Sequence, residues 1–214
     1  MAKRLGLPMF DSGIVGEGGG VDADGAGTLI AHESSWVNQN RNKGSKAKVE
    51  KLLLQALGGE KLIWAPGIKG GDVTDYHIDA LARFAGPGKV LIQLPQKPDM
   101  DDPWVRADYE AYEILKSARD ARGEKLAITV IPEPVNERVQ SYDFVASYVN
   151  HYVCNSAVIS AQFGDREADV EARDALAQAY PGREIVMLNV DELGKRGGGI
   201  HCATQQQPEA NASQ

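Results

Sequence analysis

The sequence has few cysteines and no long hydrophobic run. Only two cysteines, Cys154 and Cys202, occur among the 214 residues. Two cysteines cannot build the disulfide framework of a small secreted domain, so a reducing, cytoplasmic location is expected. No apolar stretch approaches the roughly 18 residues that a membrane-spanning helix needs. The first ten residues, MAKRLGLPMF, also lack the apolar core of a secretory signal, and no membrane partner is expected.

Basic residues are in the minority. The chain has 23 Lys and Arg against 30 Asp and Glu, a net charge of −7 and a pI of about 5.2. An acidic chain without a basic run is a poor partner for nucleic acid or for an anionic membrane surface. The negative charge weakly favours a cationic small molecule as ligand.

Patterns that bind metals or nucleotides are also missing. The four histidines, at positions 32, 77, 151 and 201, are scattered, and no Cys-x-x-Cys or His-x-x-x-His spacing occurs. A zinc site is therefore not expected. No Walker-type phosphate loop is present, and the glycine-rich stretch GEGGGVDADG is not followed by a helical pattern, so dinucleotide binding has little support.

Helical and strand-like patterns alternate along the chain, which is typical of an α/β protein. Three amphipathic helices are expected over 45–57, 103–122 and 165–180. Short apolar runs predict strands at 62–66, 89–95, 126–132, 147–153, 156–163 and 184–190. The helices recur about every sixty residues, which suggests repeated α/β modules arranged as blades around a centre.

No linker divides the chain, so we expect one domain over residues 1–208, large enough for an ordinary hydrophobic core. The polar residues 209–214 are expected to form a frayed tail. At the other end, KRLGLPMF (3–10) is similar to the end of a helix followed by a strand, as if a preceding module were left out.

Two stretches place ionisable side chains where they could form a site. In the first a glutamate precedes a run of glycines, and in the second a histidine and an aspartate are two residues apart. Glu17 stands before three glycines in GEGGGVDADGAGTL, where the plain structural alternative is a hairpin with turn residues DADGAG and a solvated Glu17. His77 and Asp79 are two residues apart in VTDYHIDALARF (73–84). In a strand-like or irregular segment this spacing points both side chains the same way. The alternative is a surface histidine and a helix-capping aspartate.

The two cysteines have different surroundings. Cys154 lies in a strand pattern, NHYVCNSAV (150–158), and fits a small core residue, while Asn150 and Asn155 fit turn or backbone-bonding roles. Cys202 follows GGGIH, where the glycines let backbone and substrate approach the sulfur. A cysteine, a histidine and carboxylates with glycine-rich approaches suit thiol nucleophilic catalysis.

Four blocks in order carry a resemblance to a known family: EGGGVDADGAGTLIAHESSWVNQNRN, WAPGIKGGDVTDYHIDALARF, SYVNHYVCNSAVISAQFGD and GGGIHCATQQQP. Together they resemble agmatine deiminases, within the Porphyromonas-type peptidyl-arginine deiminase family of guanidine-modifying enzymes. The similarity runs from about Lys3 to Pro208. It implies a pentein-type α/β propeller with its active site on the central axis, of which this chain would supply about three of five blades.

The resemblance also implies hydrolysis of agmatine to N-carbamoylputrescine and ammonia, without metal or organic cofactor. Cys202 matches the family's nucleophile, His77 its general acid and base, and Asp79 a carboxylate that grips the guanidinium. Glu17 matches the glutamate of the family's Glu-Gly-Gly element, near the catalytic histidine. Asn150 is a weaker match, to a polar residue close to the site.

The chain departs from the family pattern at three places. The family has an upstream block, Trp-x-Arg-Asp-x-Gly-Pro, whose aspartate is a second guanidinium ligand, and this sequence contains no such block. Family members usually have glycine before the catalytic histidine and often asparagine before Ile-His-Cys, where this chain has Tyr76 and Gly199. His201 is expected to act through its backbone.

Two hypotheses of different classes follow. The first is a guanidine hydrolase with agmatine as the expected substrate, although free arginine and peptidyl arginine share the guanidinium and differ in the tail. The second is a catalytically incomplete propeller fragment that binds a partner chain or a guanidine ligand without turnover. Exposed strand edges and blade faces would then favour a homo-oligomer or a partner chain. A cysteine protease leaves Asp79 and the Glu17 segment without a role, while an amidinotransferase shares the covalent intermediate and passes it to an amine.

Overall fold

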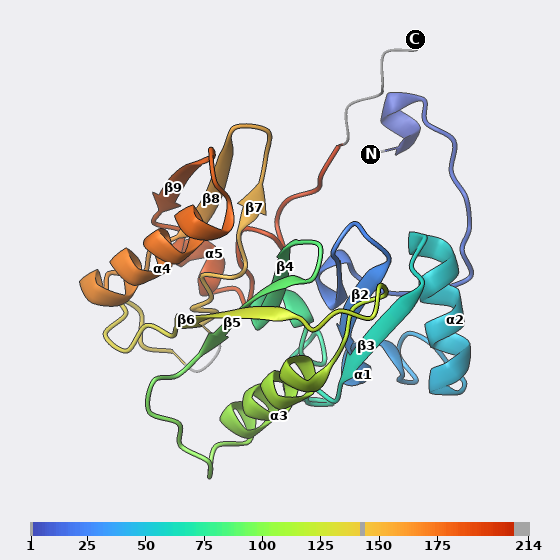
Figure 1. Ribbon diagram of the computed structural model, residues 1–214, viewed down its shortest axis with the longest axis horizontal. Coiled ribbons are helices and arrows are strands. Elements are labelled where there is room, and N and C mark those ends of the chain that lie inside the picture. Colours follow the sequence, from blue (N-terminus) through green and yellow to red (C-terminus); the bar gives the residue numbers. More distant parts are fainter. Residues whose placement is uncertain (1, 142–143, 208–214) are drawn as a thin grey trace.

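The computed structural model describes residues 2–141 and 144–207, and Figure 1 shows the course of the chain. The tail expected over 209–214 lies outside the described residues. Within the described residues, nine strands form three separate sheets of three strands each. The α/β class predicted from the sequence is confirmed.

The three sheets follow one plan, a ββαβ unit that occurs three times along the chain. The first two strands of a unit pair antiparallel, and the third returns through a helical crossover to pair parallel with the second. Unit 1 consists of β1 (Val21–Ala23), β2 (Thr28–His32), α1 (Glu33–Trp36), α2 (Lys46–Leu57) and β3 (Lys61–Ala65). Unit 2 consists of β4 (Ala82–Gly86), β5 (Lys89–Leu94), α3 (Pro103–Ser117) and β6 (Ala127–Pro132). Unit 3 consists of β7 (Tyr152–Val153), β8 (Ala157–Ala161), α4 (Arg166–Ala179) and β9 (Glu184–Leu188), and α5 (Asp191–Gly194) follows it. Short 3-10 helices lie at Ala2–Leu5, Gly18–Gly20 and Ile78–Ala80.

The helix predicted over 103–122 is too long, because it ends at Ser117. Asp120 accounts for the early end. Its Oδ1 accepts hydrogen bonds from the backbone N–H groups of Arg122 and Glu124, each at 2.9 Å. An aspartate that captures nearby backbone donors favours a tight turn over a further helical turn.

The strand predicted over 147–153 is wrong for most of its length, since only its last two residues pair, as β7. Tyr148 shows the reason. Its backbone N–H donates to the side-chain oxygen of Gln93 at 2.8 Å, and its carbonyl accepts from the Ser160 hydroxyl at 3.0 Å. Side chains therefore occupy the backbone groups that a strand ladder needs.

Of two predictions near the N-terminus, the hairpin is confirmed and the strand is wrong. DADGAG forms the predicted hairpin between β1 and β2, with Asp24 Oδ1 accepting from the N–H groups of Ala26 at 2.7 Å and Thr28 at 2.9 Å. The strand expected at the end of KRLGLPMF is wrong. Residues 7–10 are exposed and pair with no strand in the described part of the chain. A lone strand has no ladder to stabilise it.

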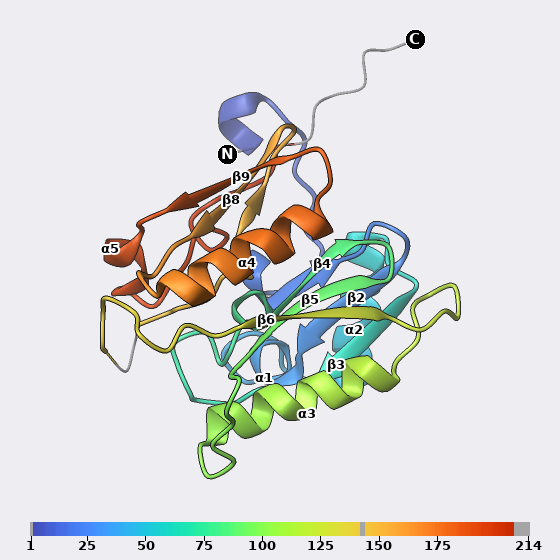
Figure 2. The ribbon, with the colours of Figure 1, turned by 60° about the vertical axis from the view of Figure 1, so that its left-hand side comes forward.

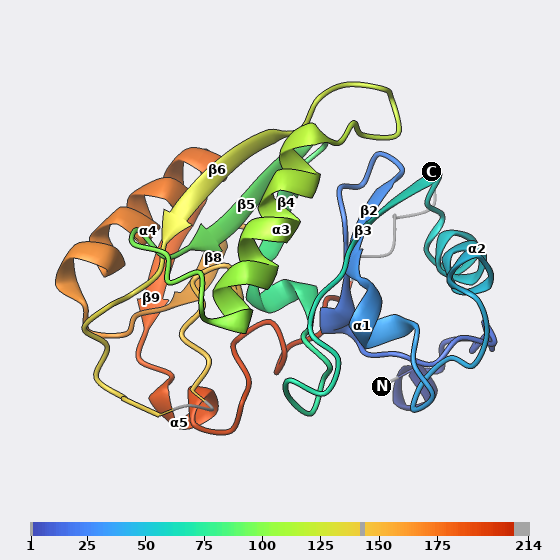
Figure 3. The same ribbon diagram turned by 90° about the horizontal axis from the view of Figure 1, so that it is seen from below.

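Hydrophobic packing joins neighbouring units through their helices. One core cluster includes Ile63 of β3 and Leu115 of α3, so it lies between units 1 and 2. A second includes Ile131 of β6 and Leu176 of α4, between units 2 and 3. A third lies between the sheet of unit 1 and α2. Figure 2 shows α3 below the strands of units 1 and 2, and Figure 3 shows α2 and α4 at opposite sides of the molecule with the sheets between them.

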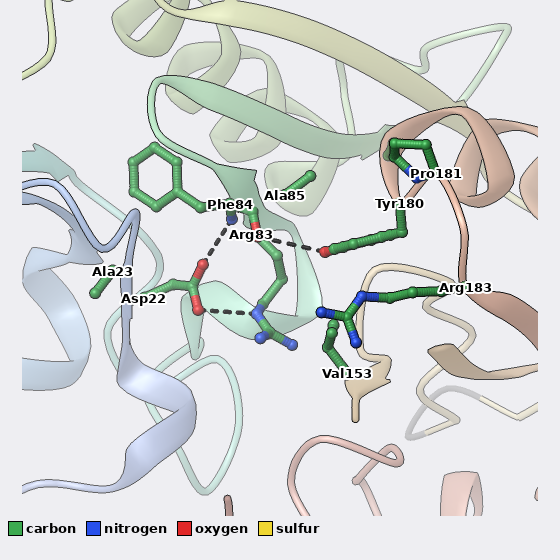
Figure 4. Close-up of a pocket in the computed structure, with 10 residues that line it drawn as sticks. Asp22, Ala23, Arg83, Phe84, Ala85, Val153, Tyr180, Pro181 and Arg183 are labelled. Atoms are coloured by element: carbon green, nitrogen blue, oxygen red, sulfur yellow. Dashed lines mark hydrogen bonds and ion pairs between the residues drawn. The ribbon is translucent and has the colours of Figure 1, made fainter. Parts of the chain in front are cut away.

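The first strands of the units also meet at a buried ion pair. Asp22 of β1 accepts from Arg83 Nε at 3.0 Å and from the Phe84 N–H at 2.6 Å, both on β4 (Figure 4). Arg83 Nη1 donates to the carbonyl of His151, just before β7, at 2.8 Å. The Tyr180 hydroxyl reaches the carbonyl of Phe84 from the end of α4, at 3.4 Å. These contacts hold the inner edges of all three units together, beside a pocket of about 390 Å³.

We predict that Asp165→Ala lowers the free energy of unfolding by about 1–2 kcal/mol at neutral pH, measured by urea titration. Asp165 caps α4 through the Ala168 N–H at 3.3 Å and accepts from the N–H groups of Asn136 and Val135 at 3.0 Å each. The hydrogen bonds from Asn136 and Val135 hold the pKa of Asp165 below its usual range. The stabilisation is therefore present above the unfolded pKa, near 4, and is lost as pH falls through the lower folded pKa.

The matched control is Asp174→Ala, on the exposed face of the same helix. That change is expected to alter the free energy of unfolding by less than about 0.5 kcal/mol. An equal loss in both variants, or an Asp165→Ala effect that does not shrink as the pH falls below about 4, would contradict the prediction.

Candidate active site

The five predicted site residues come from related places in the fold. Glu17 lies shortly before β1, His77 and Asp79 shortly before β4, and Asn150 shortly before β7. Each therefore sits on the segment that leads into the first strand of a unit. Because those first strands meet at the inner edge, the lead-in segments converge. Cys202 joins them from the turn that follows α5, and the structure thus brings all five together.

Asp79 lies at the middle of this group and is almost completely buried, with 1% of its side chain exposed. Its Oδ2 atom is 2.7 Å from His201 Nδ1 and 3.6 Å from the Cys202 sulfur. Its Oδ1 atom is buried and has no hydrogen-bond partner among the described residues. A buried carboxylate oxygen in this state is an acceptor available to a ligand that carries N–H groups.

Asn150 fastens the cysteine loop to the Asp79 segment. Its Nδ2 donates to the carbonyl of Asp79 at 3.2 Å and to the Cys202 sulfur at 3.3 Å. Its Oδ1 accepts from the backbone N–H of His201 at 2.9 Å. A Cβ atom at Gly199 would lie 2.2 Å from that oxygen, so no side chain fits there while Asn150 keeps its place. In this structure the contact therefore requires glycine at a position where the resemblance leads one to expect asparagine.

Glu17 and His77 form a second pair, with 3.3 Å between Glu17 Oε2 and His77 Nε2. An ionised carboxylate can only accept a hydrogen bond, so Nε2 carries the proton in this contact. The other ring nitrogen, Nδ1, then has a lone pair to offer when the ring is neutral. The predicted acid–base pair is therefore in hydrogen-bonding reach.

Gly19 lets the glycine-rich segment approach both carboxylate and imidazole. A Cβ atom at this position would lie 2.5 Å from Asp79 Oδ2 and 2.8 Å from His77 Nδ1. No side chain can be accommodated at such distances without moving one of these groups. At Gly18, by contrast, a Cβ atom meets nothing within 4 Å. The requirement for glycine is thus specific to position 19 and tied to the site.

The turn before His77 has a left-handed backbone conformation, which residues other than glycine rarely adopt. Asp75 and Tyr76 have φ angles of 57° and 66°, in the left-handed region. Each such residue costs on the order of 1–3 kcal/mol unless the surroundings hold it in place. The Tyr76 ring packs against His32 at 4.5 Å and Trp104 at 4.9 Å between centroids, and its hydroxyl donates to Asp108. These contacts stabilise tyrosine in the left-handed conformation, at a position where the resemblance leads one to expect glycine.

Burial shifts the titration of the groups around that turn. It raises the pKa of Asp108 to about 7, because the Tyr76 hydroxyl only partly offsets the loss of solvent. It lowers the pKa of His32 to about 4, although the carbonyl of Tyr76, 2.9 Å from His32 Nδ1, works in the opposite direction. His32 is therefore neutral at pH 7 and supports the turn as an uncharged ring.

The sulfur of Cys202 faces a carboxylate. The residue is exposed as a whole, but its sulfur lies against Asn150 and Asp79. Loss of solvent around the sulfur and the negative charge of Asp79 together raise the pKa of Cys202 above its usual range. Without a cation beside Asp79, the thiol is consequently protonated at neutral pH.

Sequence reasoning missed three contributors. Gly19 was one of several glycines, and its distinction appears only when its distance to Asp79 is known. His201 was expected to act through its backbone, but its ring also binds Asp79. Arg41, in the NQNRN stretch of the first block, has 7% of its side chain exposed and pairs with Glu17 at 2.6 Å and Asp75 at 2.8 Å. The one available signal was that Arg41 lies inside a block that resembles the family.

For each predicted site residue, the sequence also allowed a purely structural role, and the structure supports that role for some of them and not for others. Asp79 does not cap a helix, since it lies inside the 3-10 helix Ile78–Ala80. His77 is not a surface residue, with 8% exposed. Glu17 is half-exposed, as the hairpin alternative requires, but it is paired with a cation as well. Cys154 is half-buried at the end of β7, where its sulfur approaches the carbonyl of Ala157 at 3.3 Å.

The described residues contain neither a group of side chains suited to a metal ion nor a helix suited to span a membrane. Among them, no three His, Cys, Asp or Glu side chains are grouped so as to hold a metal ion. Residues 2–141 and 144–207 also contain no helix with the length and apolar character of a membrane span.

Comparison with known proteins agrees with the resemblance drawn from the four blocks. Residues 1–208 match the family described as Porphyromonas-type peptidyl-arginine deiminase. The chain is 40% identical over 229 residues to a putative agmatine deiminase of Selenomonas ruminantium, covering 97% of this chain and 61% of that protein. It is 37% identical over 223 residues to the agmatine deiminase of Medicago truncatula, covering 94% and 59%.

Solved structures show the same relationship. The agmatine deiminase of Enterococcus faecalis superposes with a TM-score of 0.86 at 28% identity, over 97% of this chain and 61% of that one. A C. jejuni agmatine deiminase with substrate bound gives 0.76 at 26% identity, over 88% and 55%. The chain thus spans about three fifths of the length of the curated relatives it matches. With one family matched over residues 1–208 and the α/β fold shared with solved members, the chain belongs to the Porphyromonas-type peptidyl-arginine deiminase family.

Proposed function

We propose that this chain hydrolyses a guanidinium C–N bond, with agmatine as substrate and N-carbamoylputrescine and ammonia as products. The observation that carries the proposal is the Asp79 carboxylate, which is buried, has no hydrogen-bond partner at Oδ1 among the described residues and lies 3.6 Å from the Cys202 sulfur through Oδ2. A cation held at that carboxylate lies beside a nucleophile. The relatives named agmatine deiminases support this choice of substrate.

Recognition rests on the geometry of the guanidinium. The group is planar, its pKa exceeds about 12, and it presents several N–H donors in fixed directions. A carboxylate can accept two of these donors in parallel, which orients the central carbon. Asp79 is placed for this role, because its unpaired Oδ1 gains a partner. Fixing the carbon against the sulfur removes much of the entropic cost of attack.

The bound cation also activates the nucleophile. Burial of the sulfur and, after it, the negative charge of Asp79 raise the pKa of Cys202 in the ligand-free site. A guanidinium paired with Asp79 cancels the effect of that charge and adds a positive charge near the sulfur, which favours the thiolate. Recognition of the substrate therefore supplies part of the activation.

The reaction follows in two halves. His77 accepts the proton of the Cys202 thiol at Nδ1 as the sulfur attacks the guanidinium carbon, and it then gives that proton to the departing ammonia, which leaves an amidino-thioether on the sulfur. A water molecule then attacks the same carbon, His77 takes its proton, and the C–S bond breaks to release the ureido product and the thiolate. One imidazole acting as acid and then as base accelerates such steps by about 10²–10⁴. Glu17 orients the ring through Nε2, which leaves Nδ1 for proton transfer.

We propose in addition that units 1 to 3 are three of the five blades of a pentein-type propeller, within a single domain over residues 1–208. The resemblance includes a second guanidinium carboxylate from a block that this sequence lacks. We propose that the chain forms a homo-oligomer or binds a partner chain. In this proposal the protein acts in the cytoplasm on a small cationic guanidine. It uses no cofactor and binds neither nucleic acid nor a membrane.

The direct test is to incubate the chain with agmatine and to assay the ureido product and ammonia. We expect turnover in the wild type and none in Cys202→Ala, because the covalent step needs the sulfur. Cys154→Ala is the matched control and is expected to keep its activity, since Cys154 contacts none of the five site residues. A folded wild type without turnover, or a Cys202→Ala variant that retains it, would overturn the proposal.

A second prediction uses the glycine pair. Gly19→Ala is expected to reduce kcat/KM for agmatine by at least about 100-fold, because its methyl group displaces Asp79 or His77 from the reactive geometry. Gly18→Ala is expected to stay within a few-fold of the wild type, since its methyl group points into open space. Kinetics and thermal melting are measured together. Comparable losses in both variants would show that position 19 has no special relation to the site.

A third prediction concerns the charge of Asp79. In a Cys154→Ser background, Asp79→Asn is expected to lower the pKa of Cys202, because the carboxylate charge that now raises it is removed. The rate of alkylation by iodoacetamide as a function of pH measures this change, and at neutral pH it should increase. Asp174→Asn, on the exposed face of α4, should leave the profile unchanged. An unchanged or higher midpoint in Asp79→Asn contradicts the prediction.

A further inference from the structure

Arg41 connects the two segments that carry the acid–base pair. Its Nε donates to Glu17 Oε2 at 2.6 Å, and its Nη1 donates to Asp75 Oδ2 at 2.8 Å. Glu17 is the partner of His77, and Asp75 is two residues before His77 in the chain. A single planar guanidinium thus bridges both sides of the pair.

The end of this bridge at Glu17 needs support from another residue. The Glu17 side chain is 52% exposed, and its contact with His77 is long, at 3.3 Å. A half-exposed glutamate that lacks a firm partner samples several rotamers. Arg41 binds the same oxygen that faces His77 and holds it in one place. Although partial burial works against ionisation, Arg41 and, to a smaller extent, His77 together outweigh it and hold the pKa of Glu17 below its usual range.

The other end of the bridge supports the left-handed turn. Asp75 has a φ of 57° and is followed by Tyr76 with 66°. The Asp75 carboxylate accepts from the Gly70 N–H at 2.7 Å as well as from Arg41, and its carbonyl accepts from the Ser34 hydroxyl at 2.6 Å. These bonds fix a conformation that the backbone does not prefer, and that conformation sets the direction of His77.

Arg41 is itself held rigidly. Asn38 Oδ1 accepts from the backbone N–H groups of Asn40 and Arg41, each at 2.9 Å. Asn42 reaches across to Val15, with hydrogen bonds of 2.7 and 3.0 Å, two residues before Glu17. The stretch NQNRN therefore ties the Arg41 loop to the segment that carries Glu17, and the guanidinium projects from a fixed base.

We infer that Arg41 is a positioning residue for the reaction, which fixes Glu17 against His77 and anchors the turn that presents His77. The inference rests on the proposed function, since it assigns a part in that reaction. It requires a guanidinium in particular, because a planar fork can reach two carboxylates at once, whereas an ammonium serves as a single point charge. Arg41 contacts neither Cys202 nor Asp79, so it acts on the proton-transfer pair alone.

The first test is a double-mutant cycle with Glu17. Arg41→Met is expected to lower kcat for agmatine by roughly tenfold to a hundredfold while KM changes less than about threefold. Arg41→Lys should recover part of the loss, because one of the two contacts can form again. In a Glu17→Gln background, Arg41→Met should cost clearly less than in the wild type, since only the contact of Arg41 with Asp75 is then left to lose. Equal losses in both backgrounds would overturn the inference.

The control for a simple loss of stability is Arg138→Met. Arg138 makes a two-point pair with Asp191, at 2.9 Å for each bond, and touches none of the site residues. It should lose melting temperature without a tenfold loss in kcat. If Arg41→Met shows no more than this pattern, Arg41 serves stability and not positioning.

A second readout does not depend on turnover. In the wild type with ¹⁵N-labelled histidine, the Glu17 contact should keep the proton of the neutral His77 ring on Nε2, which the shifts of the two ring nitrogens report. Arg41→Met and Glu17→Gln should both move His77 toward a mixture of tautomers, while Arg138→Met should not. His77→Gln assigns the signal. Unchanged His77 shifts in Arg41→Met overturn the inference even if the enzyme is active, whereas a folded, inactive wild type with the expected shifts rejects the proposed function alone.

Discussion

The buried carboxylate of Asp79 sets the conditions that the rest of the site has to meet. A carboxylate with 1% exposure raises the free energy of the folded state unless charges or hydrogen-bond donors satisfy it. His201 satisfies one oxygen, and the other has no partner among the described residues. A ligand that supplies the missing donors therefore stabilises the folded state. Gly19, Asn150 and Cys202 all take positions that are fixed by contact with Asp79 or its segment.

The repeated unit explains how residues so far apart in sequence come together. The units meet at the inner edge beside their first strands, where Arg83 of β4 binds Asp22 of β1 and the carbonyl of His151, just before β7. The segment that leads into each first strand therefore arrives at the same central place in every unit. Glu17, Asp79 and Asn150 occupy this equivalent position in units 1, 2 and 3. The architecture supplies convergence, and the chemistry depends on which side chain each unit carries there.

Sequence alone predicted what depends on local pattern. The apolar periodicity of α2 and α4, the turn residues of the β1–β2 hairpin and the four blocks with Glu17, His77, Asp79 and Cys202 were all visible in it. Features decided by distant contacts were not visible. Asp120 ended α3 early by binding the backbone beyond it, and Gln93 and Ser160 took the backbone groups of Tyr148 out of the predicted strand.

The same limit applies to the site. Nothing local distinguishes Gly19 from Gly18, since the difference is the presence of Asp79 sixty residues later in the chain. Tyr76 looked like a departure from the family, but its φ of 66° is sustained by His32 and Trp104, which pack against the ring. Arg41 reads as an ordinary polar residue until its two carboxylates are found on either side of it.

Charge balance gives the proposed reaction a direction. Without a bound substrate, burial of the sulfur and the negative charge of Asp79 keep the pKa of Cys202 raised and the thiol neutral, so the sulfur becomes a better nucleophile when a cation binds at Asp79. A guanidinium supplies that cation, and its hydrolysis converts it into an uncharged ureido group. The product therefore binds Asp79 less strongly than the substrate does and leaves the carboxylate uncompensated again. The negative charge of Asp79 thus acts at each stage: together with burial it raises the pKa of the sulfur before the substrate binds, it binds the cation that removes its own share of this effect, and it holds the neutral product less strongly.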